Sequence, residues 1–249
     1  MTEKKMLNRE EFEDLRTESA LAMCQDEGLV KRARDLVIDA DKYHWVHQTN
    51  WFGEPILNLP QDMFALQDII YHTRPKYVVE LGVAWGGSLL FCSTLLTVLG
   101  GERVIGVDIY IPDDLKARLS SHGELSNKID LIAGSSVESD TIAHIRSIIK
   151  DCREVLVILD SYHSHDHVLA ELRLYSAFVG KGHYMICGDT IVEDIPPQDH
   201  RPRPWGPGNN PKTALESFLK ETDRFIIDNY YDRKLLLTCN PGGYLRCIK

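Results

Sequence analysis

Short apolar runs recur along the chain from residue 77 onward, and each is followed by a segment with helical spacing. The runs are about five residues long, rich in Val and Ile, and nearly free of polar residues, which is typical of parallel strands buried on both faces. They cover residues 77–81, 103–108, 129–134, 155–160 and 184–189. Strands that alternate with helices through short connections predict an α/β fold with a doubly wound, mostly parallel sheet.

Helical segments are expected between these strands, at residues 88–99, 113–119, 140–150 and 168–179. In the last of them, apolar side chains recur at the spacing of a single helix face, so this helix is expected to lie on the sheet. These side chains belong to Val168, Leu172, Tyr175 and Val179.

Residues 191–211 contain six prolines and two glycines, which excludes a regular element over this stretch. A loop of about twenty residues after a buried strand is usually functional, so we expect a lid or a substrate wall here. The remaining elements expected are a helix and three strands, at residues 212–221, 224–228, 234–239 and 244–249. The last two are expected to pair as a hairpin across residues 240–243.

The first 60 residues differ from the rest of the chain. Residues 8–40 carry apolar side chains among many charges, which suits amphipathic helices on a surface or at a subunit contact. Residues 44–63 look loop-like and hold two tryptophans, which indicates a pocket, an interface or the cover of a core edge. We therefore expect a helical extension with substrate or subunit contacts, residues 1–60, and a sheet domain, residues 61–249.

Composition narrows the class of protein. At 249 residues and 28.4 kDa, one α/β domain with an appendage is expected rather than two independent domains. The net charge of −9 argues against a main role in binding nucleic acid or an anionic membrane, since both favour a basic face. The chain has no apolar run long enough to span a membrane and no secretory signal at its start. Six cysteines without a CxxC pair indicate reduced thiols, so a cytoplasmic protein is expected.

The first strand continues into the pattern E-x-G-x-x-x-G-G-S, which is followed by a helix. Its glycines allow the backbone to turn tightly and approach a ligand, and the helix start offers free N–H groups. The pattern is not GxGxxG, and Glu80 would repel phosphate but attract a cationic ligand. Because a purely structural turn explains three glycines poorly, we predict a ligand-binding loop. Its residues are Glu80, Gly82, Val83, Ala84, Gly86, Gly87 and Ser88.

Asp108 ends the second strand, where a carboxylate can accept hydrogen bonds from both hydroxyls of an adenosine ribose. The alternative is an Asp that caps the next helix or turn. Ser135 follows the third strand, at a position where an adenine would lie, although this signal is weak alone.

Asp160 closes the fourth strand and Asp189 closes the fifth. If these strands are neighbours, about 4.8 Å apart, both carboxylates emerge at the same edge of the sheet. Such a pair needs a proton or a cation, and oxygen ligands beside an open loop suit Mg²⁺. Zinc is the competing metal because histidines lie nearby, but no cysteine or third fixed histidine completes a tetrahedral set.

His163 precedes the next helix, for which Ser164 is the expected N-cap, so its imidazole is expected at the strand end. A histidine beside a metal-bound hydroxyl can act as a general base; a solvated or core-bonded histidine is the alternative. The candidate catalytic residues are therefore His163, Asp160 and Asp189, and the candidate metal ligands are the two aspartates. His165 and His167 are expected to be structural.

Several stretches together resemble the cephalosporin hydroxylase and rhamnosyl O-methyltransferase family. They are VELGVAWGGS, VIGVD, LDSYHSHDHVLAEL, GDT and the late WGPG. The resemblance extends from about Trp45 to the end of the chain. It implies a class I S-adenosylmethionine-dependent O-methyltransferase with a seven-stranded Rossmann-like sheet. It also implies Mg²⁺ at the carboxyl edge, a sugar or natural-product acceptor, and a homo-oligomer.

Carried over by position, the resemblance implies that Gly82, Gly86, Gly87 and Ser88 surround the methionine part of the cofactor. Asp108 would bind the ribose, and Asp160, beside the cofactor, would bind metal together with Asp189. Relatives commonly carry Glu-Asp before the threonine of GDT, whereas this chain has Gly188 in place of the glutamate. One expected carboxylate is therefore missing.

Two other functions remain open from the sequence. A nicotinamide-dependent dehydrogenase shares the sheet and the acidic ribose anchor, and Tyr230 and Lys234 have the spacing of its catalytic pair, but they fall among the late strand candidates. A non-catalytic subunit could keep the fold and lose the metal site at Gly188. The identity of the acceptor is not readable from the sequence.

Overall fold

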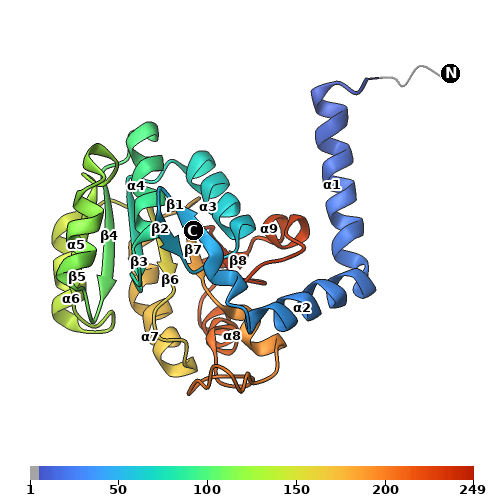
Figure 1. Ribbon diagram of the computed structural model, residues 1–249. Helices are drawn as coiled ribbons and strands as arrows, with labels where there is room; N and C mark the ends of the chain where they lie inside the picture. The colour runs from blue at the N-terminus through green and yellow to red at the C-terminus, as the bar shows by residue number, and fades with distance from the viewer. Residues whose placement is uncertain (1–5) are drawn as a thin grey trace.

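The computed structural model describes residues 6–249, and a seven-stranded sheet runs through the centre of the molecule (Figure 1). The strand order is β5-β4-β3-β6-β7-β9-β8. The strands are β3 (Tyr77–Leu81), β4 (Arg103–Asp108), β5 (Ile129–Ala133), β6 (Val155–Leu159), β7 (Tyr184–Cys187), β8 (Phe225–Ile227) and β9 (Tyr244–Cys247). The prediction of a doubly wound, mostly parallel sheet is confirmed.

The five strands from β3 to β7 are parallel, and β9 runs antiparallel to both of its neighbours, β7 and β8. The chain first builds outward from β3 to β5 and then returns to add β6 and β7 on the other side of β3. The order of the strands therefore reverses between β3 and β6. A crevice forms at such a switch point, beyond the carboxyl ends of the strands.

Helices cover both faces of the sheet and bury two apolar clusters against it. On one face lie α3 (Pro60–Thr73), α4 (Gly87–Leu99), α5 (Asp113–Ser120) and α9 (Asn229–Lys234). On the other lie α6 (Ser139–Ile149), α7 (His165–Tyr175) and α8 (Pro211–Glu221). The predicted apolar face of the helix after β6 is buried as expected, although α7 ends at Tyr175 and a 3₁₀ turn, Ser176–Phe178, follows it.

The predicted strand at residues 234–239 is wrong, and so is the hairpin across 240–243. β9 pairs with β8 instead. The reason is that the backbone of this segment bonds to a helix: the Cys239 N–H donates to Asp62 Oδ2 of α3 at 2.8 Å.

The residues just before this segment form the short helix α9 rather than extended chain. Its N-cap, Asp228, accepts a hydrogen bond from the Tyr230 N–H at 3.0 Å, which favours a helical start. Tyr230 and Lys234 therefore lie on a helix, where the Lys234 ammonium stands 4.4 Å from the Tyr230 ring centre and pairs with Asp68 at 2.7 Å.

The expected amphipathic helices at residues 8–40 are confirmed as α1 (Arg9–Gln25) and α2 (Glu27–Asp41). The loop expected at 44–63 is more ordered than predicted. It contains a 3₁₀ helix, η1 (Trp45–Gln48), and a small hairpin of β1 (Thr49–Trp51) and β2 (Glu54–Ile56) before α3 begins. The hairpin packs on α4, and Gly87 makes the contact possible because a Cβ there would lie 2.3 Å from the Pro55 carbonyl oxygen.

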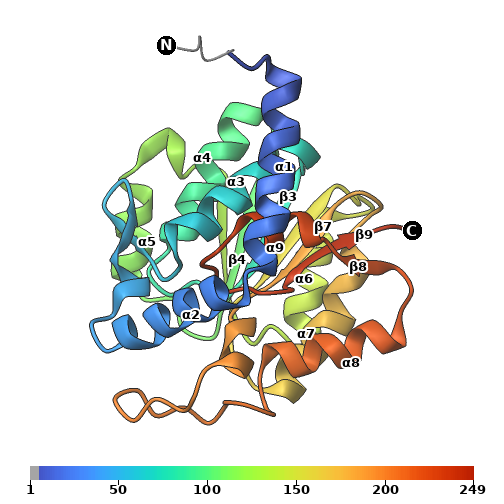
Figure 2. The ribbon, with the colours of Figure 1, turned by 90° about the vertical axis from the view of Figure 1, so that its right-hand side faces the viewer.

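α1 projects from the body of the molecule, as Figures 1 and 2 show. None of its residues is buried, and its closest neighbours are α2 and α9. Within residues 6–249, no helix is long and apolar enough to cross a membrane.

The proline-rich stretch after β7 is mostly irregular, as predicted, but it begins with a 3₁₀ helix, η4 (Thr190–Asp194). It ends where the Asn210 side chain caps α8 by accepting from the N–H groups of Lys212 and Thr213.

Candidate active site

A cavity of about 920 Å³ lies beyond the carboxyl ends of β3, β4, β6 and β7. The strand ends form its floor, residues 55–58 and the end of α2 form one side, and residues 195–207 form a roof. The proline-rich stretch therefore borders the cavity, and the expectation of a lid or substrate wall stays a prediction.

The loop after β3 packs directly against the end of β6. Gly82 adopts a φ of +95°, which side chains disfavour, and a Cβ on it would lie 2.1 Å from the Asp160 carbonyl oxygen. Only glycine fits here. The backbones of the two loops are therefore in contact at the floor of the cavity.

Glu80 lies in β3 with its side chain buried and borders the cavity. The Ser88 hydroxyl donates to Oε1, whereas Oε2 has no partner among the described residues. Burial raises the pKa of Glu80 to about 7, although the Ser88 hydrogen bond opposes the rise. A buried carboxylate with an uncommitted oxygen is suited to a cationic ligand group.

Asp108 stands at the end of β4 with its carboxylate toward the glycine loop. Its Oδ2 accepts the Val83 N–H at 2.9 Å, and its Oδ1 accepts the Tyr110 N–H at 3.1 Å. The Asp108 carbonyl accepts the Gly134 N–H at 2.9 Å, which brings Ser135 next to it. The carboxylate is thus fixed by backbone donors and keeps lone pairs for a ligand.

Not every predicted loop residue reaches the cavity. Glu80, Gly82, Val83, Ala84, Ser88, Asp108, Ser135 and Asp160 border it. In the described part of the chain Gly86 and Gly87 do not border it; they form the turn and the packing contact at the start of α4.

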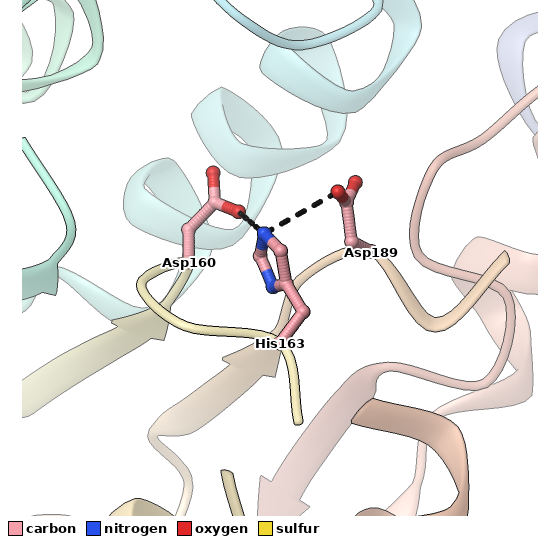
Figure 3. Close-up of side chains that lie close together, drawn as sticks. All are labelled: Asp160, His163 and Asp189. Atoms are coloured by element: carbon pink, nitrogen blue, oxygen red, sulfur yellow. Dashed lines mark ion pairs between the residues drawn. The ribbon is translucent and has the colours of Figure 1, made fainter. Parts of the chain in front are cut away.

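Asp160, His163 and Asp189 meet at the ends of β6 and β7 (Figure 3). His163 Nε2 lies 3.8 Å from Asp160 Oδ1 and 3.5 Å from Asp189 Oδ2, and the three ligand atoms lie within 4.8 Å of one another. The sequence prediction that the strand ends bring these residues together is confirmed.

The ionisation of this cluster is shaped by burial and by like charge. Burial raises the pKa of Asp160 well above its usual range, and the charges of Asp189 and Glu80 raise it further. Burial lowers the pKa of His163, which keeps its imidazole neutral at neutral pH. Two adjacent carboxylates of this kind are stabilised by a cation placed between them.

The donor set fits a small divalent cation. Asp160 and Asp189 supply carboxylate oxygens, the ligands that Mg²⁺ prefers, and one oxygen of each lies within 4.8 Å of the other. Gly188 adds no ligand, and it has no room for one, because a Cβ would lie 2.8 Å from the Leu159 carbonyl oxygen and 3.0 Å from Asp160 Oδ1.

Asp189 is held by a segment that the sequence did not connect with it. It adopts a left-handed φ of +52°, which is strained for a side chain other than glycine. The Asn240 side-chain oxygen accepts its N–H at 3.0 Å, and Thr190 donates to the Pro241 carbonyl at 2.9 Å. Asp62 in turn accepts from Thr238, Cys239 and Tyr244.

The roof is tied to the N-terminal extension by charge. Asp41 of α2 accepts from Arg201 at 2.6 Å and lies 2.6 Å from His200 Nε2. Arg203 approaches Asp189 at 3.9 Å, and the Trp205 ring meets the His163 ring edge-on, with centroids 5.3 Å apart. Sequence reasoning identified the stretch but not these contacts. The partner of His200 lies 159 residues away in the chain, and that of Arg201 lies 160 residues away.

Tyr230 and Lys234 are absent from the residues that border the cavity, as far as residues 6–249 show. A dehydrogenase pair would have to reach the bound nucleotide. The spacing of Tyr230 and Lys234 therefore matches that of a dehydrogenase pair only by coincidence.

The family described as "Rhamnosyl O-methyltransferase/CmcI" matches residues 43–248. The chain belongs to this family. The resemblance read from the sequence is thereby confirmed, and the matched range includes the whole sheet and the hairpin that packs on α4.

Curated relatives agree with this assignment. A rhamnosyl O-methyltransferase of Mycobacterium leprae is 30% identical over 229 residues, which cover 88% of this chain and 93% of the relative. A rhamnosyl O-methyltransferase of Mycobacterium tuberculosis is 28% identical over 216 residues, covering 83% of this chain and 84% of the relative.

Solved structures share the fold of this rhamnosyl O-methyltransferase/CmcI family member. Two structures of CmcI, one an apo-structure and one with Mg and SAM, match with a TM-score of 0.57 and 23% identity. The match covers 82% of this chain and 77% or 78% of the CmcI chains. The SAH-bound methyltransferase PaMTH1 of Podospora anserina matches with a TM-score of 0.52 and 16% identity, over 89% of this chain and 92% of that one.

Proposed function

We propose that this chain is an S-adenosylmethionine-dependent, Mg²⁺-assisted O-methyltransferase that acts on a hydroxyl of a sugar or of a glycosylated natural product. The observation that carries the proposal is a single cavity that holds both a ribose-type carboxylate, Asp108, and a carboxylate pair, Asp160 and Asp189. Membership of the rhamnosyl O-methyltransferase family supports the reaction class.

The methyl donor would lie over the ends of β3 and β4. Asp108 is available to accept the two ribose hydroxyls, because its oxygens are oriented by backbone N–H groups. Glu80 would complement the positive charge of the methionine part, and Ser135 would contact the base. Val83, Ala84 and Ser88 would complete the contacts, with Gly82, Gly86 and Gly87 shaping the loop.

Asp160 and Asp189 are the residues that would hold Mg²⁺. When bound, the ion supplies positive charge that lowers the pKa of an acceptor hydroxyl. The protein's own contribution is to orient the two carboxylates: Asn240 fixes the backbone of Asp189, and contact with Gly82 fixes that of Asp160.

His163 is the residue that we assign to proton removal. Its Nε2 faces the carboxylate pair, and burial keeps it neutral and therefore able to accept a proton. Methyl transfer also needs the acceptor oxygen in line with the sulfonium methyl, so positioning by the roof supplies part of the rate.

The acceptor would occupy the outer part of the cavity, between residues 55–58 and the roof at 195–207. Aromatic and polar side chains border the cavity, among them Tyr162, Trp205 and His47. Flat aromatic rings with nearby hydrogen-bonding groups suit a sugar ring.

The proposal is tested with labelled S-adenosylmethionine and a panel of rhamnosides, other glycosides and nucleotide sugars, with Mg²⁺ or with a chelator. We expect label in one acceptor class and a loss of turnover without the metal. Calorimetry runs in parallel with S-adenosylhomocysteine, NAD(H) and Mg²⁺. Binding of NAD(H) alone would support the dehydrogenase, and binding of S-adenosylhomocysteine without Mg²⁺ would support a non-catalytic subunit.

We also propose that the protein is a cytoplasmic homo-oligomer. All six cysteines are free in the described chain, which fits a reducing compartment. The exposed apolar side chains Phe12, Leu15 and Leu21 on α1 fit a subunit contact. Light scattering coupled to gel filtration measures the mass, and a monomer at micromolar concentration would contradict the second part.

A further inference from the structure

Glu171 of α7 lies behind the cavity and gathers three donors on one oxygen. Its Oε1 accepts from Ser136 Oγ at 2.5 Å and from Ser161 Oγ at 2.6 Å, and it lies 3.1 Å from His167 Nε2. The Glu171 side chain is fully buried, and its Oε2 has no partner within residues 6–249. Glu171 has no part in the proposed methyl transfer.

The three donors border the cavity, although they come from three separate segments. Ser136 follows β5, Ser161 follows β6, and His167 is in the first turns of α7. We call Ser136 and Ser161 the serine wall. The buried carboxylate thus joins two loop ends that belong to strands three places apart in the sheet order.

The serine wall adjoins the place assigned to the nucleoside. Gly134, two residues before Ser136, donates its N–H to the Asp108 carbonyl. Ile109, next to Asp108, borders the same cavity with 80% of its surface exposed, which offers an uncommitted apolar face to a flat ring. A purine attached to a ribose at Asp108 would lie on Ile109 with an edge toward the wall.

The number of protons on each group determines whether the serine wall donates or accepts hydrogen bonds toward the cavity. A hydroxyl has one proton to donate and two lone pairs. Because Oε1 of Glu171 can only accept, both serine protons are directed to it, away from the cavity. The two serines are left to present lone pairs to a ligand. His167 Nε2 belongs to the same cluster, 3.1 Å from Glu171 Oε1 and 3.2 Å from each serine oxygen.

We propose that Glu171 is a positioning residue that turns the serine wall into a hydrogen-bond acceptor and thereby selects a 6-aminopurine over a 6-oxopurine in the methyl donor. The exocyclic amino group of adenine donates to such a wall. A 6-oxo group would instead face oxygen lone pairs and leave them unmatched. The inference rests on the proposed use of S-adenosylmethionine.

The test compares S-adenosylhomocysteine with S-inosylhomocysteine, which carries oxygen in place of the amino group. Calorimetry measures the affinity of each for the full-length protein. The wild type is expected to prefer the adenine compound on the order of 10- to 100-fold, because an unmatched buried polar group is costly. In Glu171→Met the serine protons are released toward the cavity, and the preference is expected to fall below about threefold.

Glu171→Gln is the rescue variant. Its amide oxygen can take the place of Oε1 and its amide nitrogen that of the unpartnered Oε2, so the preference for adenine is expected to return. Asp62→Asn is a matched control, since Asp62 is also a buried carboxylate with three donors but lies on α3, on the other face of the sheet. It is expected to leave the ratio of the two affinities unchanged.

Equal losses of both affinities in Glu171→Met, with an unchanged ratio, would mean that Glu171 only holds the loops together, and would overturn the inference. A wild type that binds both compounds equally would overturn it as well. A wild type that binds neither compound while remaining folded would instead refute the proposed function, so the two failures are distinguishable.

Discussion

Burial of Glu80 is expected to lower the stability of the folded protein at neutral pH while it favours binding of a cationic ligand, and both effects can be measured. Its carboxylate is buried, one oxygen has no partner in the described chain, and its pKa is raised from 4.5 to about 7. A raised pKa means that the folded protein binds this proton more tightly than the unfolded chain does. The stabilising contribution is therefore complete below pH 4.5 and is lost as the pH rises to about 7.

Glu80→Gln removes this dependence. At pH 8 the variant without ligand is expected to be more stable to unfolding than the wild type by about 3 kcal/mol, and at pH 4.5 the two are expected to be nearly equal. Its affinity for S-adenosylmethionine is expected to fall about tenfold, because the partner of the cationic end is lost. Urea unfolding at several pH values and calorimetry measure the two effects. A stability difference that does not change with pH would contradict the prediction.

His163→Gln isolates the proton-accepting role. Turnover is expected to fall by about 10² to 10⁴, the usual contribution of a general base. The affinity for S-adenosylhomocysteine is expected to change less than about threefold, since the residue lies at the carboxylate pair rather than at the donor loop. His165→Gln is the control from the same segment, as His165 faces Thr213 on α8. Comparable turnover in the two variants would refute the assignment.

The three aspartates found from sequence share one property: each stands at or just after the end of a predicted strand. Asp108, Asp160 and Asp189 could be placed at one edge because parallel strands align their carboxyl ends. Asn240 and Glu171 could not, because their roles come from side chains that meet only after folding. No local pattern indicates that Asn240 will bond to a turn 51 residues earlier.

At the scale of elements, the five parallel strands were predicted to within two residues because buried parallel strands give continuous apolar runs. The same apolar signal gave the wrong strand at residues 234–239, since a short apolar run does not distinguish a strand from partly buried irregular chain. α3 was missed within the loop expected at 44–63, although Pro60 stands at its first turn, a position that proline favours.

The segment after α9 holds the turn after β7 in place through the hydrogen bond between Asn240 and the Asp189 N–H. The variant Asn240→Ala tests this role. The Asp189 N–H loses its acceptor, so the left-handed backbone that aims the carboxylate is no longer enforced. Mg²⁺ affinity is expected to fall about tenfold, and the free energy of unfolding by about 1 kcal/mol. Calorimetry with Mg²⁺ and with S-adenosylhomocysteine measures the effect, and only the former is expected to weaken. Equal weakening of both would indicate general disruption of the fold.

At the scale of the whole molecule, α1 stands apart from the core. It contributes no buried side chain, so a variant lacking residues 1–25 is expected to lose less than about 1 kcal/mol of stability. Its affinity for S-adenosylhomocysteine is expected to match that of the full chain, because α1 does not border the cavity in the part of the chain described. Its mass by light scattering is expected to drop if α1 forms the subunit contact. A loss of ligand binding would show that α1 supports the site.

The close approach of Gly82 to the Asp160 carbonyl fixes the distance between the loop after β3 and the loop after β6. Because main chain meets main chain there, the spacing between the loop after β3 and the end of β6 does not depend on the side chains that border the cavity. Evolution can remodel the roof to admit new sugars while this interval stays constant. Under the proposed function, a change of side chains in the roof would alter which hydroxyl can enter the cavity and leave the spacing of the proposed donor and metal sites unchanged.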